Sequence, residues 1–437
     1  MLNISSAKSF RFYTILLYLI HQQIFYHFQL RSIRMDKKLV IAAVDVIASN
    51  TDILCEILVR LPASSLIRFS AVCKLWYSII MSMPFRIRHS RCLAFANALP
   101  PTGIYFYNCL AKVQNLESLS LTDNVSSLPP LHDELTTSTT IGGDVVEVID
   151  FKVTQSCNGL FMCILTERSN TSTSRKGLVY NPVNKFRYVL PTCTVSDEWE
   201  YYNLISYPEP PYYKALCATY LAGGNLGASS MGLYVLEGDS WRHCGSMDAT
   251  GHGFDSGVFW NGAIHWIGVY FSVYFVVSSE EVGRIELPMA PRGPCNQKLR
   301  HFGESGGHLH LIRVKNLYAK KFIVLELDKD TLTWSMKYRV HLAKLISTFP
   351  EMAQQTPSGT QYAYSILSLI RGEMEEDSVL LLTIPGKVVT YNLVLKTVNV
   401  IRELPGEVHD TLRFDHLSSY QYTASFAPGE DWTIDPK

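Results

Sequence analysis

The chain has 437 residues, and its 39 Lys and Arg residues are balanced by 39 Asp and Glu residues, so the formal net charge is zero. Such a chain has no basic field that would attract phosphate backbones or anionic membranes, and we expect neither nucleic acid nor a membrane as a partner. Apolar residues make up 47% of the chain and charged residues only 18%, which favours a large buried core over disorder.

The cysteines are scattered along the chain and form no Cys-x-x-Cys pair. Without a convincing secretory signal, this pattern is typical of reduced, mostly buried thiols in a protein of the cytoplasm and/or nucleus. His308 and His310 alternate as neighbours on a strand do, and His243-Cys244 is an isolated dipeptide. We therefore predict no metal site and no cofactor.

Residues 1–45 are predicted to form an N-terminal extension that is either poorly ordered or helical. Its apolar run, Phe12 to Ile20, has about half the length that spans a bilayer, and no signal-peptidase site follows it. A signal anchor is the alternative interpretation. A dispensable extension is favoured because the sequence MDKK at Met35 would make an ordinary polar start.

Residues 46–92 predict a module of three short amphipathic helices. Asn50, Thr51 and Asp52 offer side-chain oxygens that can cap a first helix, which Pro62 ends. Ser64 or Ser65 can cap the second helix, and Pro84 is predicted to mark the end of the third. The apolar residues recur at helical spacing, namely Ile53, Leu54, Ile57, Leu58 and Leu61, then Leu66 and Phe69, then Val72, Leu75, Trp76, Ile79 and Ile80.

A module of about forty residues is too small to bury so many large apolar side chains by itself. One expectation is that another protein covers part of this surface through a helix-against-helix interface. The other is that the module packs on the domain that follows it in the chain.

Residues 93–430 predict a large all-β domain, and residues 431–437 a C-terminal tail. Short apolar runs are separated by Gly, Pro, Asn and Asp, as in strands joined by tight turns. Similar units recur at roughly 45 to 65 residues, the size of a propeller blade. We therefore predict a β-propeller of six or seven blades, with a β-sandwich or an irregular barrel as the alternative.

The segment Gly303-Glu304-Ser305-Gly306-Gly307 fits the spacing of a hydrolase nucleophile elbow. Such an elbow needs a helix after the serine, whereas the following HLHLIRV alternates as a strand does. We therefore predict that Gly306 and Gly307 form a turn with positive φ, that Ser305 is incidental, and that the protein is not an enzyme.

Two further segments are open to a functional interpretation. The acidic segment Gly372 to Asp377 is predicted to be a solvated hairpin loop rather than a metal site. The tyrosine-rich segment Tyr201 to Tyr213 is either a packed connection between blades or an exposed recognition loop.

The predicted helical module resembles the F-box motif of plant F-box proteins. Matching positions are Asp52, Leu54, Glu56-Ile57-Leu58, Arg60-Leu61-Pro62, Ser65-Leu66, Arg68-Phe69, Val72-Cys73-Lys74, Trp76, Pro84-Phe85 and His89. The resemblance implies docking onto a Skp-family adaptor, and through it onto the cullin and RING subunits of an SCF ubiquitin ligase. Ser49-Asn50 stands where F-boxes usually have Leu-Pro, a departure that can weaken the adaptor contact.

The all-β region resembles the kelch-like, F-box-associated domains of the same proteins. The segments that carry this resemblance are Ser156-Cys157-Asn158-Gly159-Leu160, Asn181-Pro182, Asn261-Gly262-Ala263-Ile264-His265-Trp266 and Gly306-Gly307-His308-Leu309. The resemblance implies a platform that binds a target protein, of which the sequence names neither the identity nor the contact residues.

Together these observations predict a non-catalytic substrate-recognition subunit of an SCF-type E3 ubiquitin ligase. The alternative is a stand-alone propeller that binds a protein or a glycan and carries a vestigial F-box. The residues predicted to contact the adaptor or to support that contact are Ile53, Leu54, Ile57, Leu58, Leu61, Pro62, Leu66, Phe69, Val72, Cys73, Trp76 and Ile80.

Overall fold

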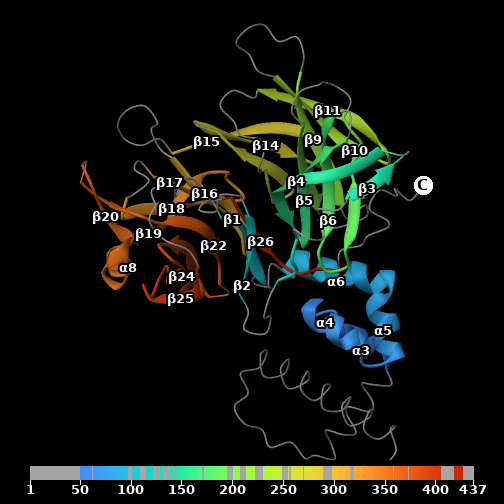
Figure 1. Cartoon of the computed structure of the whole chain (residues 1–437), viewed down its shortest axis with the longest axis horizontal. Helices are drawn as coiled ribbons and strands as arrows, with labels where there is room; N and C mark the ends of the chain where they lie inside the picture. The colour runs from blue at the N-terminus through green and yellow to red at the C-terminus, as the bar shows by residue number, and fades with distance from the viewer. Residues whose placement is uncertain are drawn as a thin grey trace, which may run out of the picture. The chain divides into compact units, whose positions relative to one another are not determined.

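The computed structural model of the chain describes most residues from 50 to 426 (Figure 1). The described ranges are 50–61, 63–96, 101–108, 115–121, 128–131, 135, 138–141, 144–169, 172–193, 200–206, 213–221, 230–248, 254, 257–268, 270–288, 298–314, 319–357, 359–372, 374–404 and 418–426. The predicted extension, the predicted tail and the run from Phe12 to Ile20 lie outside them. Within them, no helix has the length and apolarity needed to cross a bilayer. The chain divides into two compact units, residues 1–92 and 93–437.

The first unit contains four helices among its described residues: α3 (Thr51–Leu58), α4 (Ala63–Ser70), α5 (Lys74–Met81) and α6 (Met83–Ala96), the last of which continues past the unit's boundary. Asn50 caps α3 as predicted, because its Oδ1 accepts hydrogen bonds from the backbone N–H groups of Asp52 and Ile53 at 3.0 and 3.1 Å.

The third predicted helix, α5, ends at Met81, just before Pro84 as predicted, and Pro84 itself lies in the first turn of a further helix, α6, where proline costs no intrahelical hydrogen bond. One prediction about helix boundaries in this unit is wrong. Ser64 and Ser65 do not precede α4 but lie in its first turn, since that helix begins at Ala63. Sequence periodicity did not reveal α6, because its apolar residues follow no clear amphipathic pattern.

The core of the helical unit is small and depends on Trp76. This side chain is buried and meets the ring of Phe69 edge-on, with ring centroids 5.6 Å apart. His89 is fully buried and its Nε2 lies 2.8 Å from the carbonyl oxygen of Leu61, which joins α6 to the segment after α3. Burial lowers the pKa of His89, so the neutral imidazole donates this bond.

The second unit is a β-propeller, and its described strands form six blades. We number these blades in chain order and list the strands of each blade from the innermost outward. Blade 1 is the exception, because its list begins with β3, which pairs with the innermost strand β4. Blade 1 contains β3 (Ser138–Ile141), β4 (Asp144–Cys157), β5 (Leu160–Arg168), β6 (Thr173–Asn181) and β7 (Phe186–Val189); blade 2 contains β8 (Glu200–Ser206), β9 (Tyr213–Tyr220), β10 (Ser230–Glu237) and β11 (Ser240–Asp248); blade 3 contains β12 (Val258–Trp260), β13 (Ala263–Ile267), β14 (Phe271–Val276) and β15 (Glu281–Glu286).

The remaining blades complete the ring. Blade 4 contains β16 (Lys298–Ser305), β17 (His308–Val314), β18 (Lys321–Leu327) and β19 (Trp334–His341); blade 5 contains β22 (Ser365–Ile370), β23 (Val379–Ile384), β24 (Lys387–Asn392) and β25 (Val398–Glu403); blade 6 contains β26 (Ser419–Tyr422), β1 (Gly103–Asn108) and β2 (Asn115–Ser120). All described strand pairs are antiparallel. An additional hairpin, β20 (Ala353–Thr356) and β21 (Gly359–Tyr362), lies between blades 4 and 5 in sequence.

Each innermost strand contacts the innermost strand of the next blade, from β4 through β8, β12, β16 and β22 to β26, which contacts β4 again. Figure 1 shows the six sheets arranged around a common centre. The propeller predicted from the sequence is therefore confirmed, and the sandwich and the irregular barrel are excluded.

The ring closes because the last described strand pairs with the first strand of the propeller. β26 is antiparallel to β1, with Gly103 opposite Tyr422 and Phe106 opposite Ser419. Blade 6 is fastened to blade 1 by three buried rings, Tyr105, Phe161 and Tyr422, whose centroids lie 5.1 to 5.6 Å apart. Closure thus combines backbone hydrogen bonds with aromatic packing.

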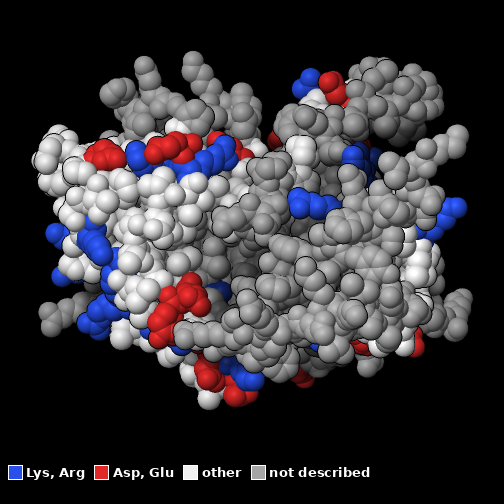
Figure 2. Space-filling model, turned by 90° about the horizontal axis from the view of Figure 1, so that it is seen from below, with Lys and Arg blue, Asp and Glu red and all other residues white. Residues whose placement is uncertain are grey.

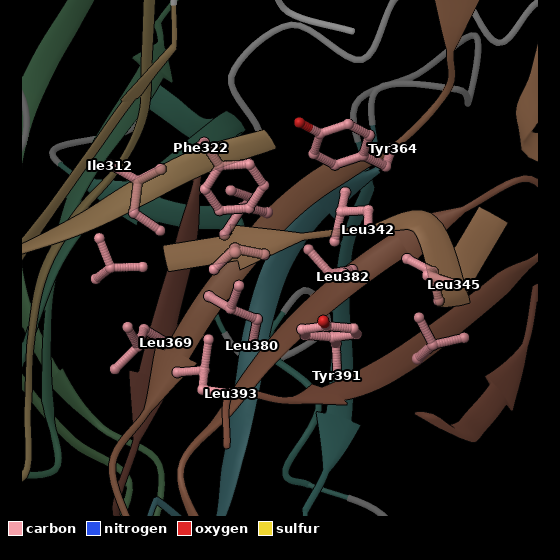
Figure 3. Packing of buried hydrophobic residues seen from close by; sticks show 14 of the residues in the cluster. Ile312, Phe322, Leu342, Leu345, Tyr364, Leu369, Leu380, Leu382, Tyr391 and Leu393 are labelled. Carbon is pink, nitrogen blue, oxygen red and sulfur yellow. The ribbon is translucent and has the colours of Figure 1, made fainter. Parts of the chain in front are cut away.

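Blades 4 and 5 enclose a large apolar cluster (Figure 3). Ile312 and Phe322 enter it from blade 4, and Leu380 and Tyr391 enter it from blade 5. The helix α8 (Ala343–Thr348) contributes the fully buried Leu345. The connection between these two blades is therefore anchored in the core of the propeller.

On the surface displayed in Figure 2, basic and acidic side chains lie next to one another. Among the described residues of that face, neither sign of charge forms a continuous field. This mixture agrees with the zero formal net charge of the chain.

Replacing Phe161 by alanine should destabilise the propeller by about 3–5 kcal/mol, because the fully buried ring joins blade 1 to the closing strand. Urea unfolding followed by tryptophan fluorescence measures the loss. The control is Val189→Ala on β7 of the same blade, where 46% of the side chain is exposed and a change below about 0.5 kcal/mol is expected. Equal losses in the two variants would contradict the proposed closure.

Acidification should destabilise the propeller partly through His265, whose pKa is lowered to about 4 mainly by burial. Below about pH 6.5 the histidine becomes protonated in the unfolded chain but stays neutral in the folded chain. The free energy of unfolding is therefore unaffected by His265 above pH 6.5 and decreases as the pH falls towards 4. The loss at pH 5 is about 2 kcal/mol. His265→Phe keeps an aromatic ring beside Tyr274 and should remove that part of the pH dependence. Parallel stability profiles for wild type and variant would show that His265 has no such role.

Candidate functional site

The helical unit leaves large apolar side chains at its surface. Their exposed fractions are 39% for Ile53 on α3, 45% for Ile67 on α4, and 44%, 57% and 38% for Leu75, Tyr77 and Met81 on α5. Scattered apolar residues are ordinary on any protein, but five in a unit of this size offer considerable apolar area to a partner. We call these five residues the helical-unit surface.

The predicted adaptor-binding residues divide by burial. Those with no more than 4% of the side chain exposed are Leu54, Leu58, Leu61, Leu66, Trp76 and Ile80. Ile57, Phe69 and Val72 are half-buried, Ile53 and Cys73 are exposed, and Pro62 lies outside the described residues. The buried residues can shape the surface, whereas the exposed and half-buried ones can touch a partner directly.

Four residues of the helical-unit surface were absent from the predicted set. Leu75 belonged to the apolar face predicted for the third helix, yet nearly half of it is exposed. Ile67 and Tyr77 each follow a buried residue, Leu66 and Trp76, and so lie about 100° away from the buried side of their helix. These residues and Met81 could have been found by searching for apolar residues just beside the main apolar stripe of each helix.

Charges at the edge of this unit are paired with one another. The carboxylate of Glu56 on α3 forms an ion pair with Arg88 on α6 and lies 3.9 Å from Arg60. The hydrogen bond from Arg88 lowers the pKa of Glu56. This group of three side chains keeps one positive charge, and the exposed Arg68 and Lys74 stand next to Ile67 and Leu75 in the chain.

Ser305 has a structural role that the amino-acid sequence did not reveal. It ends β16, and β17 begins at His308 as a strand rather than as the helix that a nucleophile elbow requires. Its Oγ accepts a hydrogen bond from the backbone N–H of Arg371 at 3.0 Å and donates one to Oε1 of Gln421 at 3.4 Å. The prediction that Ser305 is incidental is wrong, because the buried hydroxyl joins blades 4, 5 and 6.

The predicted turn after Ser305 is confirmed. Gly306 and Gly307 have φ values of +60° and +81°. Asn158-Gly159 and Asn261-Gly262 also have positive φ at both residues, between the inner and second strands of blades 1 and 3. Gly306 has a second constraint, since a Cβ there would lie 2.8 Å from Cβ of Arg371.

Both histidines of β17 contact the carboxylate of Glu326. His308 Nδ1 and His310 Nε2 lie 3.2 and 3.3 Å from the two carboxylate oxygens of Glu326 on the neighbouring strand. The histidines lower the pKa of Glu326 despite its partial burial. Among the described residues, no group of three or more His, Cys, Asp or Glu side chains is arranged to hold a metal ion.

Replacing Ser305 by alanine should cost about 1–3 kcal/mol of stability, because the N–H of Arg371 would lose its acceptor in a buried place. The midpoint of urea unfolding measures the effect. Ser240→Ala is the matched control, since Ser240 is exposed and its hydroxyl makes only a local bond to Glu237. A shift no larger than that of the control would contradict a structural role for Ser305.

Comparison with known proteins gives relatives along most of the chain. An F-box protein of Arabidopsis thaliana is 28% identical over 406 residues, which cover 87% of this chain and 91% of that protein. A second Arabidopsis F-box protein is 27% identical in an alignment that covers 79% of this chain and 82% of that protein. The Arabidopsis protein named F-box only protein 8 is 26% identical over 54% of this chain and 79% of its own length.

Family comparison assigns both units. Residues 50–88 match the F-box domain, which corresponds to helices α3 to α5 and the start of α6. Residues 112–363, more than half of the chain, match the F-box associated beta propeller domain. The resemblances seen in the sequence are thereby confirmed. The chain belongs to the plant F-box proteins that carry an F-box-associated β-propeller.

Proposed function

We propose that this protein is the substrate-recognition subunit of an SCF-type E3 ubiquitin ligase. The observation that carries the proposal is the F-box match at residues 50–88, in a unit that exposes five large apolar side chains. Such side chains favour a helix-against-helix interface with a Skp-family adaptor. The cullin and RING subunits would be joined through that adaptor.

Energetics support a protein partner for the helical-unit surface. Burying an exposed Leu or Ile completely contributes about 1.5–3 kcal/mol, so a few such residues at the centre of an interface can dominate its stability. Leu75 and Tyr77 lie on α5 on either side of the buried Trp76, and they are 44% and 57% exposed.

The mechanism that we propose is proximity. The F-box holds the protein on the ligase, and the propeller holds a target so that its lysines meet the ubiquitin-carrying enzyme at high effective concentration. The bond-forming chemistry then belongs to other subunits, and this chain acts as a non-catalytic receptor. Such a receptor would work in the cytoplasm and/or the nucleus.

Tyr77→Glu and Leu75→Glu should each weaken adaptor binding at least about tenfold, because each places a charge in an apolar interface. Titration calorimetry of the full chain with a purified Skp-family adaptor measures this. Tyr270→Glu is the matched control, since 59% of Tyr270 is exposed on the propeller, close to the 57% of Tyr77. Circular dichroism establishes that each variant is folded.

Truncation of Trp76 would be a poor test of the same interface. Trp76 is 1% exposed and packs on Phe69, so its loss would unfold the unit whether or not an adaptor binds there. If the folded wild-type chain binds no adaptor, the proposal fails and the stand-alone binding propeller is favoured. If Tyr77→Glu and Tyr270→Glu bind equally well, the helical-unit surface is not the docking site.

A further inference from the structure

Exposed apolar side chains gather on blade 5 of the propeller. Met374, Val394 and Leu395 have 61%, 40% and 59% of their side chains exposed, and Val400 and Ile401 on β25 have 44% and 41%. The residues that match the family propeller domain end at 363, before this blade begins. The family assignment therefore does not account for these side chains.

Two turns of blade 5 lie side by side and carry the most exposed of these residues. The first turn joins β22 to β23 and contains Met374, and the second joins β24 to β25 and contains Leu395. Asn392 connects them, because its Nδ2 donates to the carbonyl oxygen of Glu376 at 2.6 Å while its Oδ1 accepts from the N–H groups of Val394 and Leu395 at 2.9 and 2.6 Å.

Several contacts join the two ends of the first turn. The N–H of Gly372 donates to Oγ of Ser378, and a Cβ at Gly372 would lie only 2.2 Å from Cβ of Asp377. Arg371, at the start of the turn, is bound to Ser305 of blade 4. A surface arranged in advance loses little conformational entropy when a partner binds.

Acidic side chains flank the exposed Met374. Glu375 is paired, since its two carboxylate oxygens lie 3.5 Å from Nζ of Lys337 and 3.4 Å from Arg371. Glu376 and Asp377 are exposed, and within the described ranges neither carboxylate forms an ion pair. The lysine of the second turn, Lys396, directs its ammonium group to the carbonyl oxygen of Leu393 instead.

We propose that Met374, Val394, Leu395, Glu376 and Asp377, here called the blade-5 patch, bind a segment of a target protein that combines aliphatic side chains with Lys or Arg. The aliphatic side chains would cover the apolar residues, and the cationic groups would meet the two unpaired carboxylates. Methionine suits such a site because its flexible side chain adapts to differently shaped partners. The role of the segment as a ubiquitination target rests on the proposed function, whereas the binding itself does not.

The test is a selection of random 12-residue peptides displayed on phage against the full chain. Selected peptides should be enriched in Lys or Arg together with Leu, Ile, Met or Phe. A synthetic copy of the most enriched peptide should bind wild type in fluorescence anisotropy. Its Kd should rise at least about tenfold in Glu376→Lys/Asp377→Lys and in Met374→Ser/Leu395→Ser, and its affinity should fall as salt rises.

Tyr270→Ser is the matched control and should bind the peptide as wild type does. Tyr270 is as exposed as Leu395 but lies on blade 3. Enrichment of acidic or uncharged peptides, equal binding to the patch variants, or no enrichment at all would overturn the proposal. Self-association of wild type that the patch variants abolish would instead assign the patch to a second copy of the chain. Adaptor binding is measured on the same samples, so failure of this proposal is distinct from failure of the ligase assignment.

Discussion

The pairing of β26 with β1 is the interaction on which the propeller depends. Gly103 and Phe106 face Tyr422 and Ser419, so the pairing joins segments more than 300 residues apart. Closing so long a loop carries an entropic cost, which is smaller when the intervening blades already bring the two strands together. Without it, β1 and β26 would each leave an unpaired edge and the ring of six blades would be open.

The closing strand is also tied sideways to the blades on each side of it. Tyr420 of β26 donates its hydroxyl to the carbonyl oxygen of Val153 on β4, while the N–H of Val153 donates to the hydroxyl of Tyr107 on β1. On the other side, Gln421 donates to Ser368 and accepts from Ser305. These groups are buried or half-buried, and each bond leaves a costly unsatisfied partner if it is broken. Polar contacts therefore fix which blades are neighbours, while apolar clusters supply most of the packing.

Local features of the fold were predictable from the sequence, and long-range ones were not. The cap at Asn50, the turn at Gly306 and Gly307 and the hairpins between strands depend on neighbouring residues, so periodicity and turn chemistry revealed them. The role of Ser305 depends on Arg371 and Gln421, which no local pattern relates to it. The helical-unit surface was predicted only in part for a similar reason. Spacing identified the apolar stripe, but burial within the stripe is decided by how the helices pack.

The two apolar surfaces of the protein differ in their charges, and this difference allows them to select different partners. Beside the helical-unit surface, Glu56 is paired with Arg88 and lies 3.9 Å from Arg60, which leaves these three side chains with one positive charge. Beside the blade-5 patch, Glu376 and Asp377 keep unpaired charges among the described residues, and an acidic segment would be repelled. Specificity is a difference between two affinities, and repulsion of the wrong partner contributes to it as much as attraction of the right one. Under the proposed function, the receptor would hold a ligase and a target at once, and it would benefit when neither partner competes for the surface of the other.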